Sequence, residues 1–455
     1  KLTTLTILSL IKKKFTSFAN AQNVSCIMSK QYIETSDDEK REMNGYKPRG
    51  PKPGTKFFKP GSKFSNLPPR VDLRKYMTTI EDQDQLNSCS ANAAAGAFEY
   101  LIKRNQEVDF DVSRMFLYYN AREIDDSIDE DEGTYISSVI ESLNKLGGCS
   151  EETWPYNIEA YAEKPDSDSY EEAEQLRIDD YFAIEVNLNQ WKQALAEGYP
   201  IIFGLNLYDS FESQRKPGVI PNPTKTDINR SEHASHAMLC VGYSDTDRVF
   251  IVRNSWGKKW GDKGYCYIPY NYMMDPDQNM GDSWVIRQVN EIEDYDDSWE
   301  DDSSITGDYD TELAEMSDED YDEMLEAMGD YPLEMRIALI ILTVAAADGD
   351  ISEQEIEEIY HYLETTLEKL GIKRSAKRLL TKSIDLLGED ELFEESVSLL
   401  NQYLSDELLA KILNDTIDIV GVDDVEDEEN EIINQLTEAW QLEDVEDEDE
   451  DEDED

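Results

Sequence analysis

The stretch that decides the fold is QDQLNSCSANA, residues 83–93, in which a single cysteine, Cys89, stands before the apolar run AAAGAFEY. Apolar residues at three- and four-residue spacing predict a helix over residues 89–103. The unpaired N–H groups and the positive dipole end at a helix N-terminus stabilise a thiolate and lower the pKa of the thiol. Cys89 is therefore predicted to be a nucleophile, and Gln83 lies six residues before it.

Two later motifs supply the partners that a nucleophilic thiol requires. HAMLCVGY begins at His236 and NSWG begins at Asn254. The order Cys, His, Asn, with separations of 147 and 165 residues, is close to an arrangement in which both partners follow the cysteine by ~130–150 residues. His233, three residues before His236, is an alternative base, but the strand pattern and the Val-Gly-Tyr that follows favour His236.

Further motifs extend this pattern in both directions. They are LPPRVDLR at 67–74, Gly-Gly-Cys at 147–149 and Trp-Pro-Tyr at 154–156. With them the chain resembles the papain-like cysteine peptidases, and in particular a divergent prokaryotic-type branch, over residues 67–290. The resemblance implies an α+β fold of two lobes, one helical and one an antiparallel sheet, with the active site between them.

Local sequence patterns agree with two unlike lobes. Helical spacing continues at Thr134–Leu146, where Gly147 and Gly148 end it. Segments rich in β-branched and aromatic residues, separated by turn residues, predict strands in the second half. These strands are expected at Ile201–Leu205, His236–Tyr243, Val249–Arg253 and Gly264–Ile268.

The resemblance also implies roles for individual residues in the endopeptidase reaction. Cys89 would attack the peptide carbonyl, and His236 would stabilise the thiolate and protonate the leaving amine. Asn254 would orient the imidazole, and the Gln83 carboxamide with the Cys89 N–H would donate to the oxyanion. Trp256 and Trp260 would shield the His–Asn hydrogen bond from water, and Trp256 is also a candidate substrate-binding residue. No cofactor or metal is required by this chemistry.

Two residues depart from the family string around the nucleophile, because Asn87 and Ser90 stand where glycine and an aromatic residue are usual. Substrate preference therefore cannot be transferred. Gly133 is the candidate for pairing with an extended peptide substrate, although a glycine before a helix is also ordinary turn chemistry. Two other functions remain open, a catalytically idle scaffold and an acyl or peptide transferase that uses the same thiol.

The cysteines indicate where such an enzyme works. The five cysteines are an odd and sparse set, and Leu86 occupies a position that is cystine-forming in many secreted relatives. We expect Cys149, Cys240 and Cys266 to be buried apolar residues. A reducing, cytoplasmic location is therefore expected, and no stretch approaches the ~20 apolar residues of a membrane span.

The charge of the 455-residue chain, formally −60, is unevenly distributed. Residues 291–330 contain 19 acidic and no basic residues, and residues 422–455 contain 20 and none. Such runs repel themselves and stay extended, which predicts an acidic linker over 291–331 and a disordered tail over 442–455. Nucleic acid is an unfavourable partner for this charge, and a protein or peptide substrate is expected.

The N-terminal extension, residues 1–66, has the opposite character near its end. Seven basic and no acidic residues lie between Tyr46 and Val71, interleaved with Pro and Gly that exclude a long helix. This segment is either a flexible lead-in or a short inhibitory or docking strap across an acidic surface. Met28 is the expected biological start, so that residues 1–27 would not be native.

Residues 332–441 form a separate all-helical unit that resembles the TerB-like (tellurite-resistance-associated) domain, on the motif AAADGDISEQE, residues 345–355. The acidic residues of this motif, Asp348, Asp350, Glu353 and Glu355, suggest either helix capping or a weak divalent-cation site; the spacing is not that of an EF-hand. A protein partner is the other ligand to expect for this unit. His361 is expected at its surface.

Overall fold

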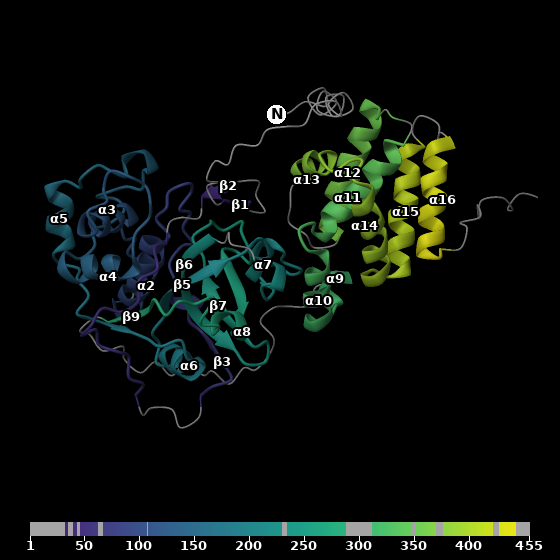
Figure 1. Ribbon diagram of the computed structural model, residues 1–455. Coiled ribbons are helices and arrows are strands. Elements are labelled where there is room, and N and C mark those ends of the chain that lie inside the picture. Colours follow the sequence, from purple (N-terminus) through teal and green to yellow (C-terminus); the bar gives the residue numbers. More distant parts are fainter. Residues whose placement is uncertain are drawn as a thin grey trace, which may run out of the picture. The chain divides into compact units, whose positions relative to one another are not determined.

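A computed structural model describes residues 32–34, 40–42, 46–61, 67–106, 108–229, 234–287, 312–347, 349, 351–369, 376–421 and 427–442. The chain divides into two compact units, an N-terminal unit over Met28–Glu315 and a helical unit that contains Met316–Asp455 (Figure 1). Across the described residues, the helices are too short or too polar to cross a membrane.

The N-terminal unit is built on a seven-stranded antiparallel sheet. Its strand order is β4-β9-β5-β6-β7-β8, and β3 pairs with the carboxyl-terminal end of β6. The strands are β3 Arg70–Asp72, β4 Asp180–Ala183, β5 Ile201–Leu207, β6 Ala234–Ser244, β7 Val249–Arg253, β8 Tyr265–Pro269 and β9 Ser283–Arg287. The four strands predicted from the sequence correspond to β5, β6, β7 and β8, and the fully buried β5 explains the continuous apolar run there.

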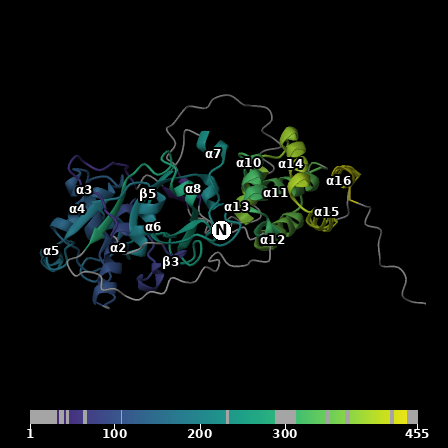
Figure 2. The same ribbon diagram turned by 90° about the horizontal axis from the view of Figure 1, so that it is seen from below.

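Helices cover one end of this sheet, and both views agree that α2 to α5 lie together there (Figures 1 and 2). The helices are α2 Cys89–Gln106, α3 Arg114–Ile124, α4 Ile136–Lys145, α5 Ser167–Ala173, α6 Leu188–Ala196, α7 Lys225–Asn229 and α8 Tyr270–Met273. Short 3-10 turns are η1 Leu73–Tyr76, η2 Ile158–Ala160 and η3 Asp209–Glu212. The two predicted helices are α2 and α4, and α4 ends before Gly147, whose φ of +89° suits glycine.

Helix α2 is the centre of this unit, because nearly all of its residues are buried. It packs against β5 and β6 as well as α3 and α4. Small side chains between Ala91 and Ala97 let the helix approach the sheet closely, and at Gly96 a Cβ atom would lie 3.4 Å from the Leu239 and Arg253 side chains. The first residue of this buried helix is Cys89, so the packing fixes the position of the thiol.

Part of the N-terminal extension contacts this unit. Strands β1 Tyr32–Glu34 and β2 Lys40–Glu42 pair with each other, and residues 46–61 follow as a segment that we call the strap. Tyr46 forms a parallel bridge with Thr134 at one end of the strap, and Phe57 forms one with Ala183 near the other. The strap is therefore held at both ends. Residues 1–27 and 62–66 lie outside the described residues.

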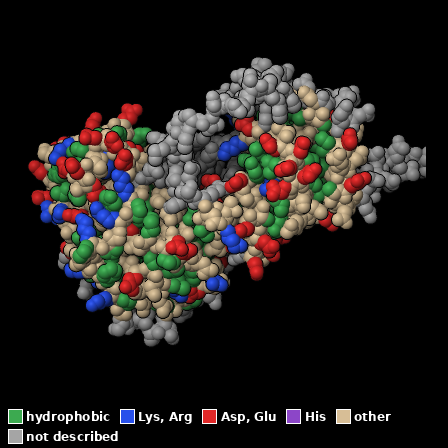
Figure 3. Space-filling view, in the orientation of Figure 1, with side chains coloured by type: hydrophobic (Ala, Val, Ile, Leu, Met, Phe, Trp, Pro, Cys, Tyr) green, Lys and Arg blue, Asp and Glu red, His purple; other side chains and the backbone are tan. Residues whose placement is uncertain are grey.

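The helical unit is arranged around α11, which is almost entirely buried among its neighbours. Its helices are α10 Asp318–Met328, α11 Leu333–Ala345, α12 Glu353–Lys369, α13 Ala376–Ile384, α14 Asp390–Tyr403, α15 Asp406–Val420 and α16 Asp427–Trp440; α9, Glu312–Glu315, ends the preceding unit. On the face drawn in Figure 3, most Lys and Arg side chains lie on the N-terminal unit, whereas Asp and Glu lie on both.

Helix α10 lies inside the segment that its charge predicts to be an extended linker. Tyr321, Met324 and Met328 share one face of α10 and are buried. Their spacing of three and four residues is that of an amphipathic helix, whose acidic residues occupy the other faces. Counting charge alone concealed this pattern, so an extended linker does not continue to residue 331.

Candidate active site

Cys89 begins α2 and is 1% exposed. Burial raises the pKa of its thiol to about 11, although the backbone amides of Ala237 and Ser90 and the Ser90 hydroxyl act in the opposite direction. The position at a helix N-terminus predicted a lowered pKa, and this expectation is not met here because desolvation outweighs the helix terminus. A thiolate at Cys89 therefore requires a further positive charge.

His236 lies near the amino-terminal end of β6, and Asn254 directly follows the carboxyl-terminal end of the antiparallel neighbour β7. His236 Nε2 is 2.8 Å from Asn254 Oδ1, and both side chains are buried. An oxygen acceptor at Nε2 requires a proton on that nitrogen, so Nδ1 is left for proton exchange. Asn254 Oδ1 also accepts the Ser255 N–H at 2.8 Å, which fixes the amide. Ala237, whose amide acts on the Cys89 thiol, directly follows His236.

Two tryptophans enclose this hydrogen bond. The Trp256 ring centroid lies 4.9 Å from that of His236 at an interplanar angle of 31°. Trp260 packs edge-on against Trp256 at 5.0 Å, and its Nε1 donates to Glu212 Oε1. Both rings are buried, so water is kept away from the imidazole. This position suits the shielding role expected of Trp256 better than direct contact with substrate.

The Gln83 side chain is held on both sides of its carboxamide. Its Nε2 donates to the Leu86 carbonyl at 3.0 Å, and its Oε1 accepts the Ser255 hydroxyl at 2.6 Å. A primary amide has two N–H groups, so one remains for another acceptor. Since Ser255 follows Asn254, the same short segment fixes both the imidazole partner and the Gln83 amide.

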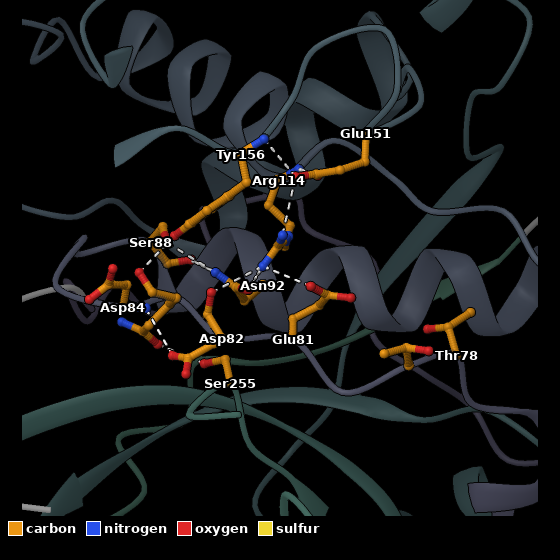
Figure 4. Close-up of polar contacts among 12 residues, drawn as sticks. Thr78, Glu81, Asp82, Asp84, Ser88, Asn92, Arg114, Glu151, Tyr156 and Ser255 are labelled. Carbon is orange, nitrogen blue, oxygen red and sulfur yellow. Dashed lines mark hydrogen bonds and ion pairs between the residues drawn. The ribbon is translucent and has the colours of Figure 1, made fainter. Parts of the chain in front are cut away.

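A buried cation that the sequence did not single out supports the loop between Gln83 and Cys89. The Arg114 guanidinium lies between Glu81, at 3.0 Å, and Glu151, at 3.1 Å (Figure 4). It stacks on the Tyr156 ring, with 4.0 Å from its Cζ to the ring centroid.

The hydroxyl of Tyr156 transmits this arrangement to the loop. It donates to the Gln83 carbonyl at 2.9 Å and lies 2.7 Å from the Ser88 hydroxyl. Both ends of the loop that leads to Cys89 are thus tied to one phenol. In the sequence, the Trp-Pro-Tyr motif pointed to Tyr156, whereas Arg114 belongs to no motif.

The two unusual residues beside Cys89, Asn87 and Ser90, have structural partners in the loop 131–134. The Asn87 side-chain amide donates to the Asp131 carbonyl at 2.8 Å, and the Ser90 hydroxyl donates to the Thr134 carbonyl at 3.1 Å. These bonds fasten the loop to the start of α2. Asn87 and Ser90, which depart from the family string, therefore connect the start of α2 to the loop 131–134.

The expected substrate-pairing residue, Gly133, uses its N–H within this loop. That group donates to the Tyr118 hydroxyl at 3.2 Å. Pairing with an extended chain occurs instead at the next residue, where the Lys47 N–H donates to the Thr134 carbonyl at 3.3 Å. Gly133 supplies the φ of +74° that the turn needs.

The remaining sequence candidates lie away from this cluster or outside the described residues. Cys149, Cys240 and Cys266 are buried, and burial raises the pKa of each thiol, that of Cys149 to about 12. His361 is exposed on α12. His233 is outside the described residues.

The acidic motif of the helical unit contains a helix cap. The Ser352 N–H donates to Glu355 Oε2 at 2.7 Å, and the Glu355 N–H donates to the Ser352 hydroxyl at 3.1 Å. This reciprocal pair is a capping box and accounts for the buried Glu355. Asp348, Asp350 and the side chain of Glu353 are outside the description, and the described residues hold no cluster of three acidic, His or Cys side chains suited to a metal.

Comparisons with known proteins assign the N-terminal unit to a family. Residues 67–280 match the family described as "Papain family cysteine protease". The chain is 37% identical over 247 residues to an uncharacterized peptidase C1-like protein of Acanthamoeba polyphaga mimivirus, covering 50% of this chain and 78% of the relative. It is 30% identical over 248 residues to cathepsin K of Gallus gallus, covering 52% and 70%.

A solved structure gives the same result. Xylellain, described as a cysteine protease from Xylella fastidiosa, superposes with a TM-score of 0.51 at 32% identity, over 58% of this chain and 100% of that protein. These similarities concern the N-terminal unit. The sources, a virus, a bird and a bacterium, do not assign the chain to one branch.

Proposed function

Because this chain belongs to the papain family of cysteine proteases, we propose that it hydrolyses peptide bonds through Cys89, His236 and Asn254, with Gln83 in the oxyanion hole. The observation that carries this assignment is the 2.8 Å contact between His236 Nε2 and Asn254 Oδ1. It leaves Nδ1 as the nitrogen for proton transfer, on the residue before Ala237, whose amide acts on the thiol. Mapping the cysteine modified by an epoxide thiol-trapping inhibitor tests the assignment.

The reaction follows from these positions. His236 Nδ1 takes the Cys89 proton, and the resulting imidazolium stabilises the thiolate in its buried setting. The sulfur attacks the peptide carbonyl carbon, and the imidazolium then protonates the departing amine, which leaves a thioester on Cys89. Water, deprotonated by His236, attacks the thioester, and the sulfur departs to regenerate the thiolate with release of the carboxylic acid.

The oxyanion of both steps would be stabilised by the second Gln83 N–H and the Cys89 backbone N–H. Because the first N–H and the oxygen of Gln83 are held by Leu86 and Ser255, the amide needs no reorganisation during the reaction.

Changing Gln83 to alanine should lower kcat by about 10–10³-fold, because one oxyanion donor is lost. Steady-state turnover of a small fluorogenic peptide measures this. Gln85, exposed two residues further on, is the matched control, and Gln85→Ala should leave turnover unchanged. Equal turnover in the two variants would remove Gln83 from the oxyanion hole.

We further propose that the strap inhibits the enzyme. Tyr46 is 3% exposed, and the Arg49 guanidinium donates to the Ser137 and Ser138 hydroxyls while it lies 3.6 Å from the buried Asp125 carboxylate. The same guanidinium covers the Tyr135 ring at 3.9 Å. The strap occupies the backbone groups of Thr134, so a peptide substrate cannot pair with them while the strap is bound.

A chain that begins at Leu67 should therefore turn over a small peptide faster than one that begins at Met28, by about 10–10²-fold, since loss of a buried anchor typically costs 2 kcal/mol or more. Arg49→Ala in the longer chain should give part of this increase. Lys52→Ala is the control, because its ion pair with Glu141 is exposed. Equal rates for both lengths would show that the strap does not inhibit.

Added salt should reduce only part of the difference in turnover between the chain that begins at Leu67 and the chain that begins at Met28. Pairs such as Lys47 with Glu132 and Lys56 with Asp180 are exposed and screened at a Debye length of ~8 Å in physiological salt. The contacts of Tyr46 and Arg49 are mostly buried and persist.

Two further proposals concern the rest of the chain. The helical unit is proposed to be a TerB-like module for a protein partner, supported by α11, the positive φ of Gly349 and the capping box at Ser352. A reducing, cytoplasmic location is supported by the free thiols of Cys89, Cys149, Cys240 and Cys266.

A further inference from the structure

The side chain of Tyr46 enters a recess in the wall beside the nucleophile. We call it the Tyr46 recess and define it by Gly204, Asp282 and Thr134. The Tyr46 backbone bridges to Thr134, while its hydroxyl donates to Asp282 Oδ2 at 3.1 Å. Tyr46 also lies close enough to Cys89 that a thiolate there would raise the pKa of the phenol further, beyond the larger effect of burial. The recess thus lies within electrostatic range of the Cys89 sulfur.

Gly204 makes room for the aromatic ring. A Cβ atom at this position would lie 2.1 Å from Tyr46 Cζ and 2.4 Å from its hydroxyl oxygen. Gly204 is the one glycine in β5, a strand whose other residues are larger, and a glycine inside a strand marks a close approach by another group. Its partner on β6 is Ala237, next to His236, so the recess adjoins the catalytic strand.

Asp282 forms the polar end of the recess and is fully buried. Its Oδ1 accepts the Trp284 Nε1–H at 2.6 Å, and its Oδ2 accepts the Tyr46 hydroxyl and the Arg49 N–H at 3.2 Å. Two of these three donors belong to the strap. When the strap leaves, a buried carboxylate loses them, which is unfavourable unless another donor replaces them.

We propose that the enzyme selects peptide substrates that place a tyrosine side chain in the Tyr46 recess, with Gly204 accepting the ring and Asp282 accepting the hydroxyl. This rests on the function proposed above. The strap acts as a resident ligand: its backbone joins Thr134 as an added strand does, and its side chain fills the pocket that a substrate side chain needs. The enzyme's own residues, not those of the strap, make the recess fit a phenol.

The expected discrimination is substantial. A site built to hydrogen-bond a hydroxyl rejects an analogue that lacks it by up to about 10⁴–10⁵-fold, because a buried polar group is left unpaired. Asp282 keeps its bond to Trp284 and the recess opens to solvent when it is empty, so we expect a smaller factor, roughly 10–10²-fold for tyrosine over phenylalanine. A guanidinium would also reach a carboxylate, so arginine is the competing side chain.

The test uses the full chain and fluorogenic peptides in which tyrosine, phenylalanine or arginine is placed in turn at each of four positions before the cleaved bond. At one position kcat/KM should be about 10–10²-fold higher for tyrosine than for phenylalanine. Asp282→Leu, which removes the acceptor oxygens, should reduce this ratio to near unity. Gly204→Ala should depress tyrosine and phenylalanine peptides alike while peptides with alanine there are still cleaved, since the added methyl occupies the ring's place.

The possible results separate this inference from the proposed function. If no peptide is cleaved and Cys89 is not labelled by an epoxide, the proposed function fails. If peptides are cleaved with equal preference for tyrosine and phenylalanine at all four positions, or with arginine preferred, the tyrosine pocket is wrong while the peptidase assignment stands. An unchanged ratio in a folded Asp282→Leu protein would also overturn it, and its melting temperature shows whether it is folded.

Discussion

Cys89→Ala should abolish peptide hydrolysis, with a loss on the order of 10⁴–10⁶-fold, because removal of the nucleophile in a catalytic triad leaves only the binding and oxyanion contributions. The fold should persist: Cys89 is the first residue of a long buried helix, and alanine is small and favours helices. Turnover of a fluorogenic peptide and the far-ultraviolet circular dichroism of the variant measure the two effects separately.

Cys149→Ala is the matched control for this experiment. Cys149 is also buried, with its thiol pKa raised to about 12 by burial, and stands in the Gly-Gly-Cys motif. The variant should retain activity whenever it is folded. Loss of activity and of epoxide labelling in a folded Cys149→Ala protein, with Cys89→Ala active, would reverse the assignment.

His236→Ala should reduce kcat/KM by about 10⁴-fold or more, because the site loses its proton carrier and the charge that stabilises the thiolate. The pH dependence of alkylation by iodoacetamide gives a more specific result. With His236 present, the thiolate–imidazolium pair should react at neutral pH. Without it, the buried thiol should react only at alkaline pH, because burial raises its pKa and no imidazolium remains to stabilise the thiolate.

His361→Ala provides the comparison, since His361 is exposed on α12. Its alkylation profile should match that of the unaltered protein. A neutral-pH reactivity that survives in His236→Ala would mean that another group activates Cys89, and His233 would then be the base to change next.

The sequence predicted the elements that depend on local patterns. The apolar spacing after Cys89 predicted α2, Gly147 marked the end of α4, and β-branched runs predicted β5 to β8. The order of the Cys, His and Asn motifs indicated the family, because each motif has its residues adjacent in the chain. Residues close in sequence are held in fixed geometry by the helix or strand itself, so such signals can be read without knowing the fold.

Sequence reasoning missed the contacts that join distant segments. Arg114, held by Glu81 and Glu151, belongs to no motif, and its role in holding the nucleophile loop depends on Tyr156 of another segment. Asn87 and Ser90 read as departures from a family string, and only their bonds to the loop 131–134 explain them. The helical pattern of α10 was obscured because charge, rather than apolar spacing, was counted there.

By itself, therefore, the sequence determined the papain-like architecture and the residues that carry the candidate chemistry, since both are encoded in short strings of neighbouring residues. The tertiary structure alone decided that burial raises the pKa of Cys89, because desolvation depends on everything that packs around the thiol. It also decided that Tyr46 reaches Asp282, 236 residues away along the chain. Contacts of that separation are set by the folding of the whole unit, which no local pattern records.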